Sequence, residues 1–255
     1  MIKFTKHKLK LYKKKALDLR QKTFLKFIEK GEAHLGGSFS IIECLIVLYN
    51  SVLKKNDKFI LSKSHASFPL AILLRERGYK TKITTHLEVD KINGIHCTTG
   101  SLGHGLPISV GIAFAKKVQK TKGRTFVLIS DGECQEGTTW ESLLIAAKHN
   151  LKELILIIDY NKIQALSKLK DALPLHNLKK KIAAFNWGVI EIKKGNSILE
   201  LIKTFDKLKK SNKPTAIILH TIKGKGIKEF ENDPVWHARQ LKGDDIKIGY
   251  KRLEI

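Results

Sequence analysis

Short, uninterrupted apolar runs alternate with amphipathic stretches along this chain of 255 residues. The strongest runs cover residues 125–129 and 154–158 and consist almost entirely of valine, leucine, isoleucine and phenylalanine. Runs of this length and composition are typical of strands that are buried on both faces of a parallel sheet. A segment of helical character over 138–149 separates them, so we predict a β-α-β unit.

The rest of the chain repeats this alternation. We expect further strands over 59–61, 188–192 and 215–220, and helices over 8–30, 40–53, 106–118 and 196–210, with one more helix that carries Leu70, Ile72, Leu73 and Leu74. The first helix is predicted to be amphipathic, with one stripe formed by Leu9, Tyr12, Leu17, Phe24 and Ile28. The whole pattern predicts the α/β class, as a doubly wound parallel sheet with helices on both faces, in a single domain over residues 1–255.

The net charge of +24 raises the question of nucleic-acid binding. The lysines are spread over the whole chain, and no arginine–glycine or aromatic–basic pattern that would stack bases accompanies them. We therefore interpret the charge as a lysine-rich solvated surface and expect no nucleic-acid partner. Such a surface still attracts phosphate-bearing small molecules.

Neither a membrane segment nor a secretion signal is evident. No uninterrupted apolar run approaches the ~18–20 residues of a membrane helix, and the basic start of the chain is not followed by an apolar signal core. The three cysteines, Cys44, Cys97 and Cys134, show neither disulfide nor zinc spacing. These features predict a cytoplasmic protein without membrane association, in which Cys134 is a small apolar filler.

A carboxylate and an amide follow the two strongest strands. Asp131 lies in Ser-Asp-Gly-Glu over 130–133, and Asn161 comes thirty positions later, after the second strand. Because parallel strands place their carboxyl ends at the same edge of a sheet, we expect these side chains to lie side by side where open α/β sheets bind ligands. A carboxylate, an amide and nearby carbonyl oxygens suit Mg²⁺. The pattern predicts a magnesium–diphosphate site.

Histidines and glycines add further candidates. His34, His65 and His237 each lie near the end of a predicted element, and as a set they favour proton transfer and phosphate contacts over a zinc site. The glycine turn over 100–103 is either an ordinary tight turn or a point where the backbone approaches a cofactor. The segment 223–226 is either an ordinary loop or a phosphate contact.

Two glutamates lie at the start of the helix between the two strongest strands. Glu136 and Glu141 are on and after the turn over 134–137. They are either surface carboxylates that cap the helix beginning near Thr138, where negative charge is favourable, or buried carboxylates that face a partner chain.

Taken in order, these segments resemble the N-terminal, diphosphate-binding part of transketolases, which are thiamine diphosphate enzymes. The likeness is closest to the split form, in which that part is a separate polypeptide, and it covers nearly the whole chain. Single glycine turns carry little weight, whereas the ordered set is specific. The set consists of Ala-His-Leu-Gly-Gly over 33–37, Phe-Ile-Leu-Ser-Lys-Ser-His over 59–65, Thr-Thr-Gly-Ser-Leu-Gly-His-Gly over 98–105, the segment 130–141, Asn-Lys-Ile-Gln over 161–164, Thr-Ile-Lys-Gly-Lys-Gly over 221–226, and Trp-His over 236–237.

The resemblance implies a role for each candidate. The Asp131 and Asn161 side chains and the Ile163 carbonyl would hold Mg²⁺, and the Gly132 backbone and His65 would contact the diphosphate. The contacts near the rings of the cofactor would come from Gly100, Ser101 and Leu102.

His34 and His237 are implied as the catalytic residues, which would face the reacting carbon and handle protons or sugar hydroxyls. His237 and Glu136 would also lie beside the cofactor, and Glu136 with Glu141 would lie at the contact between paired active sites.

Two departures from the family pattern bear on specificity. Ser130 stands where the cofactor motif usually begins with glycine, and we expect this small residue to be tolerated. The family often has a Gly-His-Pro segment whose histidine touches the donor sugar. Aligned from Gly100 without gaps, Leu87 falls at that histidine, and His86 lies one place earlier.

By this resemblance, a second domain binds the aminopyrimidine ring of the cofactor and supplies an activating glutamate. Eighteen residues follow His237, so we expect the pyrimidine-binding and C-terminal domains on a partner chain, in a heterotetramer. The resulting hypothesis is a thiamine diphosphate- and Mg²⁺-dependent transketolase subunit. It would transfer a two-carbon ketol unit between sugar phosphates and would be inactive without its partner.

Other functions remain open at this point. The chain is alternatively a subunit of another thiamine diphosphate enzyme, of the 2-oxo acid dehydrogenase or deoxyxylulose-phosphate synthase type, which would share the Asp131 and Asn161 motif. From a different class, it is a non-catalytic basic binding protein on the same fold. Salt-sensitive binding to a random duplex without a response to thiamine diphosphate would favour the latter.

Overall fold

The computed structural model describes residues 5–165, 167–208 and 211–255. Its central sheet is built from β1 (Lys58–Leu61), β2 (Thr125–Ser130), β3 (Leu154–Asp159), β6 (Gly188–Ile192) and β7 (Thr215–Leu219). The strands lie in the order β1-β2-β3-β7-β6, and all neighbouring strands are parallel. All five predicted strands are therefore confirmed.

Both faces of the sheet are buried. Successive residues of a strand point to opposite faces, so Phe126 and Leu128 pack into one hydrophobic core and Val127 and Ile129 into the other. Strand β3 is buried along its whole length. Burial on two sides explains why these strands are continuous apolar runs rather than alternating ones.

One face is covered by α1 (Lys6–Lys30), α3 (Ile42–Val47), α4 (Ser67–Arg75) and α9 (Ile198–Lys207). Helix α1 begins after Thr5, whose hydroxyl accepts the Lys8 N–H, and ends at Gly31. The predicted helix over 196–210 corresponds to α9, and residues 209–210 lie outside the described residues.

The predicted stripe of α1 is wrong in one position. Leu17 is 39% exposed, whereas the buried side of the helix runs through Tyr12, Ala16, Leu19 and Phe27. A period of 3.6 residues that passes through Ala16 leaves the next residue, Leu17, turned toward solvent.

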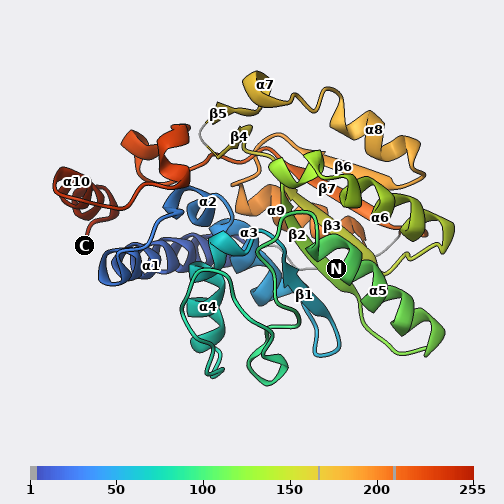
Figure 1. Cartoon of the computed structure of the whole chain (residues 1–255). Coiled ribbons are helices and arrows are strands. Elements are labelled where there is room, and N and C mark those ends of the chain that lie inside the picture. The colour runs from blue at the N-terminus through green and yellow to red at the C-terminus, as the bar shows by residue number, and fades with distance from the viewer. Residues whose placement is uncertain (1–4, 166, 209–210) are drawn as a thin grey trace.

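The other face is covered by α5 (Gly105–Val118), α6 (Gly137–Lys148) and α8 (Leu178–Ala184). Figure 1 shows α5 and α6 together on one side of the sheet, with α1 and α4 on the other. Since helices lie on both faces of a parallel sheet, the doubly wound α/β fold is confirmed.

The segment Leu35–Val52 has the length and composition of a membrane span. In the structure it forms α2 (Leu35–Phe39), then α3, then a π-helical turn (Leu48–Val52), and 83% of it is buried. A segment enclosed in this way behaves as a core helix of the domain. Helix α3 and the π-helical turn correspond to the helix predicted over 40–53.

Several short elements were not predicted. After β3 the chain forms a hairpin of β4 (Ile163–Gln164) and β5 (Ser167–Lys168), followed by α7 (Leu169–Ala172). Helix α8 was also missed, as was α10 (Asp244–Leu253), which packs on α1. Within the described residues, short 3₁₀-helical segments lie over Ser64–Ala66, Lys91–Asn93, Gly132–Gln135, Lys228–Phe230 and Pro234–His237.

Candidate active site

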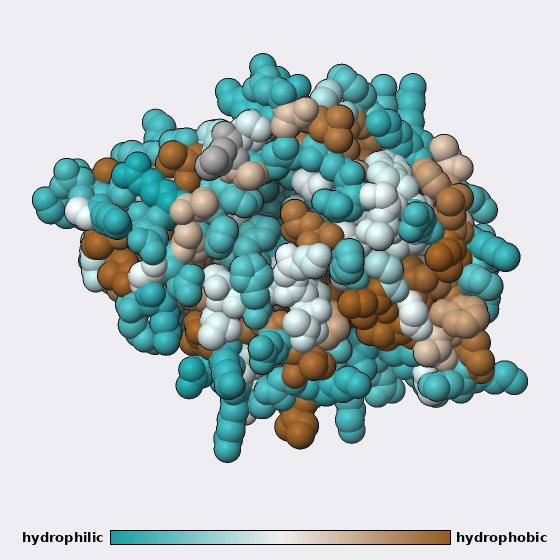
Figure 2. All heavy atoms as spheres, in the orientation of Figure 1, coloured by the Kyte–Doolittle hydropathy of each residue, from teal (hydrophilic) through white to brown (hydrophobic). Residues whose placement is uncertain are grey.

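The segments that follow four of the strands converge on one cavity of about 410 Å³. Lys63 follows β1, Asp131 follows β2, Asn161 follows β3 and Lys223 follows β7. The surface is hollowed near the middle of the face shown in Figure 2. Of the predicted site residues, the cavity is lined by His34, His65, Gly100, Leu102, Asp131, Gly132, Glu136, Asn161, Ile163 and His237. Ser101 is exposed and is not among the lining residues.

Asp131 is a buried carboxylate with 1% of its surface exposed. It accepts the N–H of Gly132 at 2.9 Å and the N–H of Lys162 at 2.5 Å. Burial and the neighbouring charge of Asp159 raise its pKa to about 7. A cation beside this carboxylate would therefore stabilise its charged form.

Asn161 and Ile163 bring two more oxygens to the same cavity. Asn161 is buried, and its Oδ1 accepts the Ile163 N–H at 3.0 Å. The ends of β2 and β3 are also joined directly, because the Asp131 N–H donates to the Asp159 carbonyl at 3.2 Å. Carboxylate, amide and carbonyl oxygens form a donor set that fits Mg²⁺. The predicted proximity of Asp131 and Asn161 is what the structure shows.

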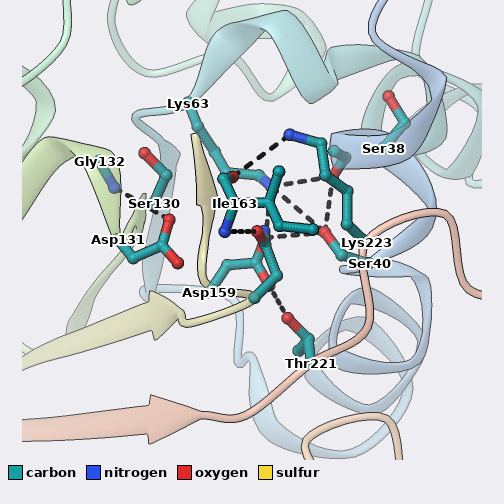
Figure 3. Close-up of polar contacts among 12 residues, drawn as sticks. Ser38, Ser40, Lys63, Ser130, Asp131, Gly132, Asp159, Ile163, Thr221 and Lys223 are labelled. Carbon is teal, nitrogen blue, oxygen red and sulfur yellow. Dashed lines mark hydrogen bonds and ion pairs between the residues drawn. The ribbon is translucent and has the colours of Figure 1, made fainter. Parts of the chain in front are cut away.

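Two buried lysines face the cavity beside these oxygens, as Figure 3 shows. Lys63 forms an ion pair with Asp159, with Nζ and Oδ2 2.6 Å apart. Burial would raise the pKa of Asp159, but Lys63 lowers it below its usual value.

Lys223 has different partners. Its ammonium donates to the Ile163 carbonyl at 3.3 Å and to His237 Nδ1 at 3.0 Å. Burial and repulsion from Lys63 lower the pKa of Lys223 to about 8. Because both hydrogen-bond partners are neutral, this buried cation favours an anion in the cavity, and a diphosphate fits that requirement.

His34 and His237 meet across the cavity wall. Nδ1 of His34 lies 2.5 Å from the carbonyl oxygen of His237. Since a carbonyl only accepts, Nδ1 of His34 carries the hydrogen and Nε2 is an acceptor. In His237 the Lys223 ammonium donates to Nδ1, so the hydrogen lies on Nε2.

The protonation of these rings is set by burial. Burial lowers the pKa of His34, and burial with the charge of Lys223 lowers that of His237 to about 3. His65 completes the cluster, with ring centroids 5.4 Å from His34 and 5.3 Å from His237. Burial lowers its pKa well below the usual value. The cavity thus holds three imidazoles that are neutral near pH 7.

The backbone around His34 is shaped for this contact. His34 has a left-handed conformation with φ of 75°, which is uncommon for a residue other than glycine, asparagine or aspartate. Two positions later, a Cβ on Gly36 would lie 2.7 Å from the Trp236 carbonyl oxygen. Glycine at this position lets the two segments approach closely enough for His34 to reach His237.

A buried glutamate fixes the glycine turn over 100–105. Glu133 is fully buried and accepts the N–H of Gly103 at 3.1 Å and that of Ser130 at 2.9 Å. A Cβ on Gly105 would lie 2.2 Å from Ser62 Oγ, so the turn is packed directly against the end of β1. The glycine turn is therefore a fixed part of the cavity wall.

The profile of the family described as "Transketolase, thiamine diphosphate binding domain" matches residues 19–254. The chain belongs to the transketolase family. It is 35% identical to one of the subunits of the apulose-4-phosphate transketolase of Actinobacillus succinogenes, over 94% of this chain and 95% of the relative. It is 32% identical to "6-deoxy-6-sulfo-D-fructose transketolase subunit SqwG" of a Clostridium species, over 92% and 94%. We refer to these two proteins as the split-transketolase relatives.

Solved transketolase structures share the fold. The transketolase from Campylobacter jejuni aligns with a TM-score of 0.85 at 27% identity, covering 94% of this chain and 42% of that one. This transketolase-family chain therefore matches the split-transketolase relatives along nearly their whole length, and less than half of the Campylobacter protein.

The geometry answers the question posed by Leu87. In this transketolase-family chain Leu87 is buried, with 5% of its surface exposed, whereas His86 lines the cavity. His86 has φ of 58°, and a Cβ on Gly100 would lie 2.7 Å from its ring. Of these two neighbours, His86 is therefore the one that reaches the cavity.

Glu136 and Glu141 lie on the exposed surface at the start of α6. Glu136 stands at the N-cap position of α6, as one of the two interpretations expected, but its side chain makes no capping hydrogen bond. Both are exposed in this chain rather than buried, and their place at a subunit contact stays a prediction. Cys134 is buried, and burial raises the pKa of its thiol, as befits a filler.

Several polar residues of the site received no individual role from the sequence. Lys63 and Asp159 were not candidates, Lys223 was named only within the 223–226 loop, and His86 only as the neighbour of Leu87. Lys63 and Lys223 lie in the motifs over 59–65 and 221–226, but nothing marks them as buried in a chain with 48 lysines and arginines. Asp159 is the last residue of an apolar strand. A carboxylate at the end of a fully buried strand is a usable signal, since it requires a buried partner.

Proposed function

We propose that this chain is the thiamine diphosphate-binding subunit of a two-chain transketolase, which transfers a two-carbon ketol unit from a ketose phosphate to an aldose phosphate. One observation carries the proposal. A chain that spans nearly all of its split-transketolase relatives gathers oxygen donors, buried cations and neutral histidines in one cavity.

Asp131, Asn161 and the Ile163 carbonyl would hold Mg²⁺, because they are the oxygen donors that line the cavity at the ends of β2 and β3. Lys223, His65 and the Gly132 backbone would receive the diphosphate. A cation and an anion placed together would offset the buried charges of Asp131 and Lys223.

The walls would position the rest of the cofactor. Gly100 and Leu102 would line it near its rings, on the turn that Glu133 holds in place. When bound, thiamine diphosphate supplies the electron sink for breaking and forming the carbon–carbon bond. The chain contributes binding, orientation and exclusion of water.

His34 and His237 would handle protons of the sugar hydroxyls. The free Nε2 of His34 can accept a hydrogen bond or a proton, and the Nε2–H of His237 can donate one. Because both rings are neutral near pH 7, they do not repel the Lys223 ammonium. His86 would contact the donor sugar at the rim of the cavity.

A partner chain would supply the pyrimidine-binding domain, and we propose a heterotetramer. Support comes from the relatives whose names describe them as subunits and from an exposed apolar surface. The large apolar side chains exposed on α5 and α6 are Ile108, Phe114, Val118, Leu144 and Ile145. Apolar atoms gather over α5 and α6 in Figure 2. An apolar surface of this kind is suited to contact with another chain.

The test is calorimetric titration of thiamine diphosphate into the purified chain with Mg²⁺, with and without the product of the neighbouring gene. Binding should require Asp131, as judged with Asp131→Ala, and should tighten when the partner is present. Ketol transfer from a ketose phosphate, with no reaction from pyruvate, should appear only with both chains. Absence of binding in both mixtures would refute the proposal, and a pyruvate-dependent product would reassign it to another thiamine diphosphate enzyme.

A further inference from the structure

Asp159 is the centre of a buried polar cluster next to the proposed metal site. It ends β3, is fully buried, and pairs with Lys63 at 2.6 Å. Figure 3 shows Ser40 and Thr221 directed at the same carboxylate. The Ser40 hydroxyl donates at 2.7 Å, and the Thr221 hydroxyl donates to the other oxygen. Segments far apart in the sequence therefore contact the same carboxylate, that of Asp159.

One further donor to Asp159 belongs to the proposed metal site. The Asn161 Nδ2 group donates to Asp159 Oδ2 at 3.1 Å, while Asn161 Oδ1 accepts the Ile163 N–H at 3.0 Å. The two ends of the amide are thus distinguished by their partners. A flipped amide would lose both hydrogen bonds, because an N–H group would face the Ile163 N–H and an oxygen would face the carboxylate.

We propose that Asp159 is a positioning residue that holds the Asn161 amide with its oxygen toward the metal site, and thereby sets the affinity for the divalent cation. This inference rests on the proposed function. Asp159 does not line the cavity and would not touch the cation, so it acts through Asn161. Partners of this kind commonly change metal affinity about 10- to 100-fold.

Lys63 and the hydroxyls of Ser40 and Thr221 keep the Asp159 carboxylate in the role of a hydrogen-bond acceptor. Three donors, from Lys63, Ser40 and Asn161, share Oδ2, and Thr221 occupies Oδ1. A carboxylate surrounded by donors is an acceptor only, so it can hold the nitrogen end of the amide but not the oxygen end. The ion pair thus selects one of two amide orientations that have nearly the same shape.

The experiment compares two double variants of the full chain, Lys63→Met/Asp159→Leu and Lys63→Met/Asp159→Asn. Removing both members of a buried ion pair avoids an unpaired charge, which is the main threat to folding. The variants are similar in size but differ in polarity, because asparagine keeps an oxygen that can accept the Asn161 N–H and leucine has no polar group. The readout is the dissociation constant of Mn²⁺ in the presence of thiamine diphosphate, measured by electron paramagnetic resonance.

We expect the leucine variant to bind Mn²⁺ about 10- to 100-fold more weakly than the wild type. The asparagine variant should recover most of the affinity. The matched control is Arg20→Met/Glu43→Leu, which removes another buried ion pair whose carboxylate also accepts an asparagine amide, that of Asn196. This control should keep the wild-type affinity within about twofold, because neither side chain touches Asn161.

Each outcome separates the two claims. If the wild type binds Mn²⁺ and the leucine variant binds it equally well, the positioning role is wrong and the proposed function stands. Equal weakening in the leucine and asparagine variants, or in the control, also overturns the positioning role, since the effect would then be general loss of structure or charge. If the wild type binds no Mn²⁺ with thiamine diphosphate, the proposed function fails, and this inference fails with it.

Discussion

His34 donates its Nδ1 hydrogen to the carbonyl oxygen of His237, 203 positions further along the chain, at 2.5 Å. The contact fixes the tautomer of His34, while Lys223 fixes the opposite tautomer of His237. One ring therefore presents an acceptor and the other a donor. The hydrogen bonds thus leave His34 able to accept a hydrogen and His237 able to donate one.

Replacement of either histidine should slow the reaction more than it weakens cofactor binding. We expect His34→Ala and His237→Ala to lower kcat/KM by about 100-fold or more, the usual contribution of a positioned proton-transfer group. The measurement is steady-state kinetics with the partner chain, alongside calorimetry of thiamine diphosphate binding. Loss of binding in parallel with loss of rate would assign these residues to the cofactor site alone.

The close approach at Gly36 can be tested through a single methyl group. Gly36→Ala would place a Cβ 2.7 Å from the Trp236 carbonyl oxygen, so the two segments must separate at a cost of about 1–3 kcal/mol in the free energy of unfolding. Activity should fall as well, because the His34–His237 contact depends on this approach. Denaturant unfolding measures the first effect and turnover the second.

Gly111→Ala is the control for that substitution. Gly111 is exposed within α5, and a Cβ added there would have no atom within 4 Å. Alanine there should raise the free energy of unfolding by about 0.5–1 kcal/mol, since glycine is a poor helix former. Destabilisation of both variants to the same extent would contradict the steric explanation for Gly36.

Lys223 should lower the stability of the cofactor-free chain and strengthen the binding of thiamine diphosphate. Its pKa of about 8 shows that burial disfavours the ammonium in the cofactor-free chain. Lys223→Met should therefore raise the melting temperature without ligand, and weaken thiamine diphosphate binding by about tenfold through loss of a charge-assisted hydrogen bond. Thermal unfolding with and without the cofactor and Mg²⁺ gives both numbers. A variant that is less stable and binds normally would exclude the role.

His96 should make the stability depend on pH. Burial and the charge of Lys58 lower its pKa to about 4, against an ordinary value of 6.5. Between these values the unfolded chain binds more protons than the folded chain, so stability is lost as pH falls from about 6.5 to 4. His96→Gln should remove about 1–2 kcal/mol of this loss, a figure reduced for the partial exposure of the ring. Equal slopes for both proteins in denaturant unfolding at several pH values would contradict it.

The sequence was most informative where physical constraints act on consecutive residues. Strands buried on both faces must be continuously apolar, so β2 and β3 were clear, and Asp131 and Asn161 followed from the rule for parallel strands. Helix α10 was missed because Gly249 interrupts its pattern. A Cβ there would lie 2.0 Å from Phe24, so the glycine is a packing requirement that only the folded chain reveals.

The buried polar residues of the site were harder to predict from the sequence. Burial of Lys63 depends on Asp159, Ser40 and Gly37 arriving from other segments of the chain. No local pattern in the sequence distinguishes such a lysine from one on the surface. The same reason explains why His86 rather than Leu87 lines the cavity, since the conformation of an irregular loop decides which of two neighbouring residues reaches it.

The position of His237 also has a consequence for the order of events during synthesis. Strand β7, which completes the sheet, ends at Leu219, and His237 comes eighteen residues later. At about 5–20 residues per second, a nascent chain can thus complete its sheet and the core around Val127 and Ile129 before the last residues are added. The other core also contains Trp236 and Leu253, so it is completed later. The acceptor nitrogen of His34 acquires its orientation only after the C-terminal segment arrives, so one core and the site are completed by the same last stretch of chain.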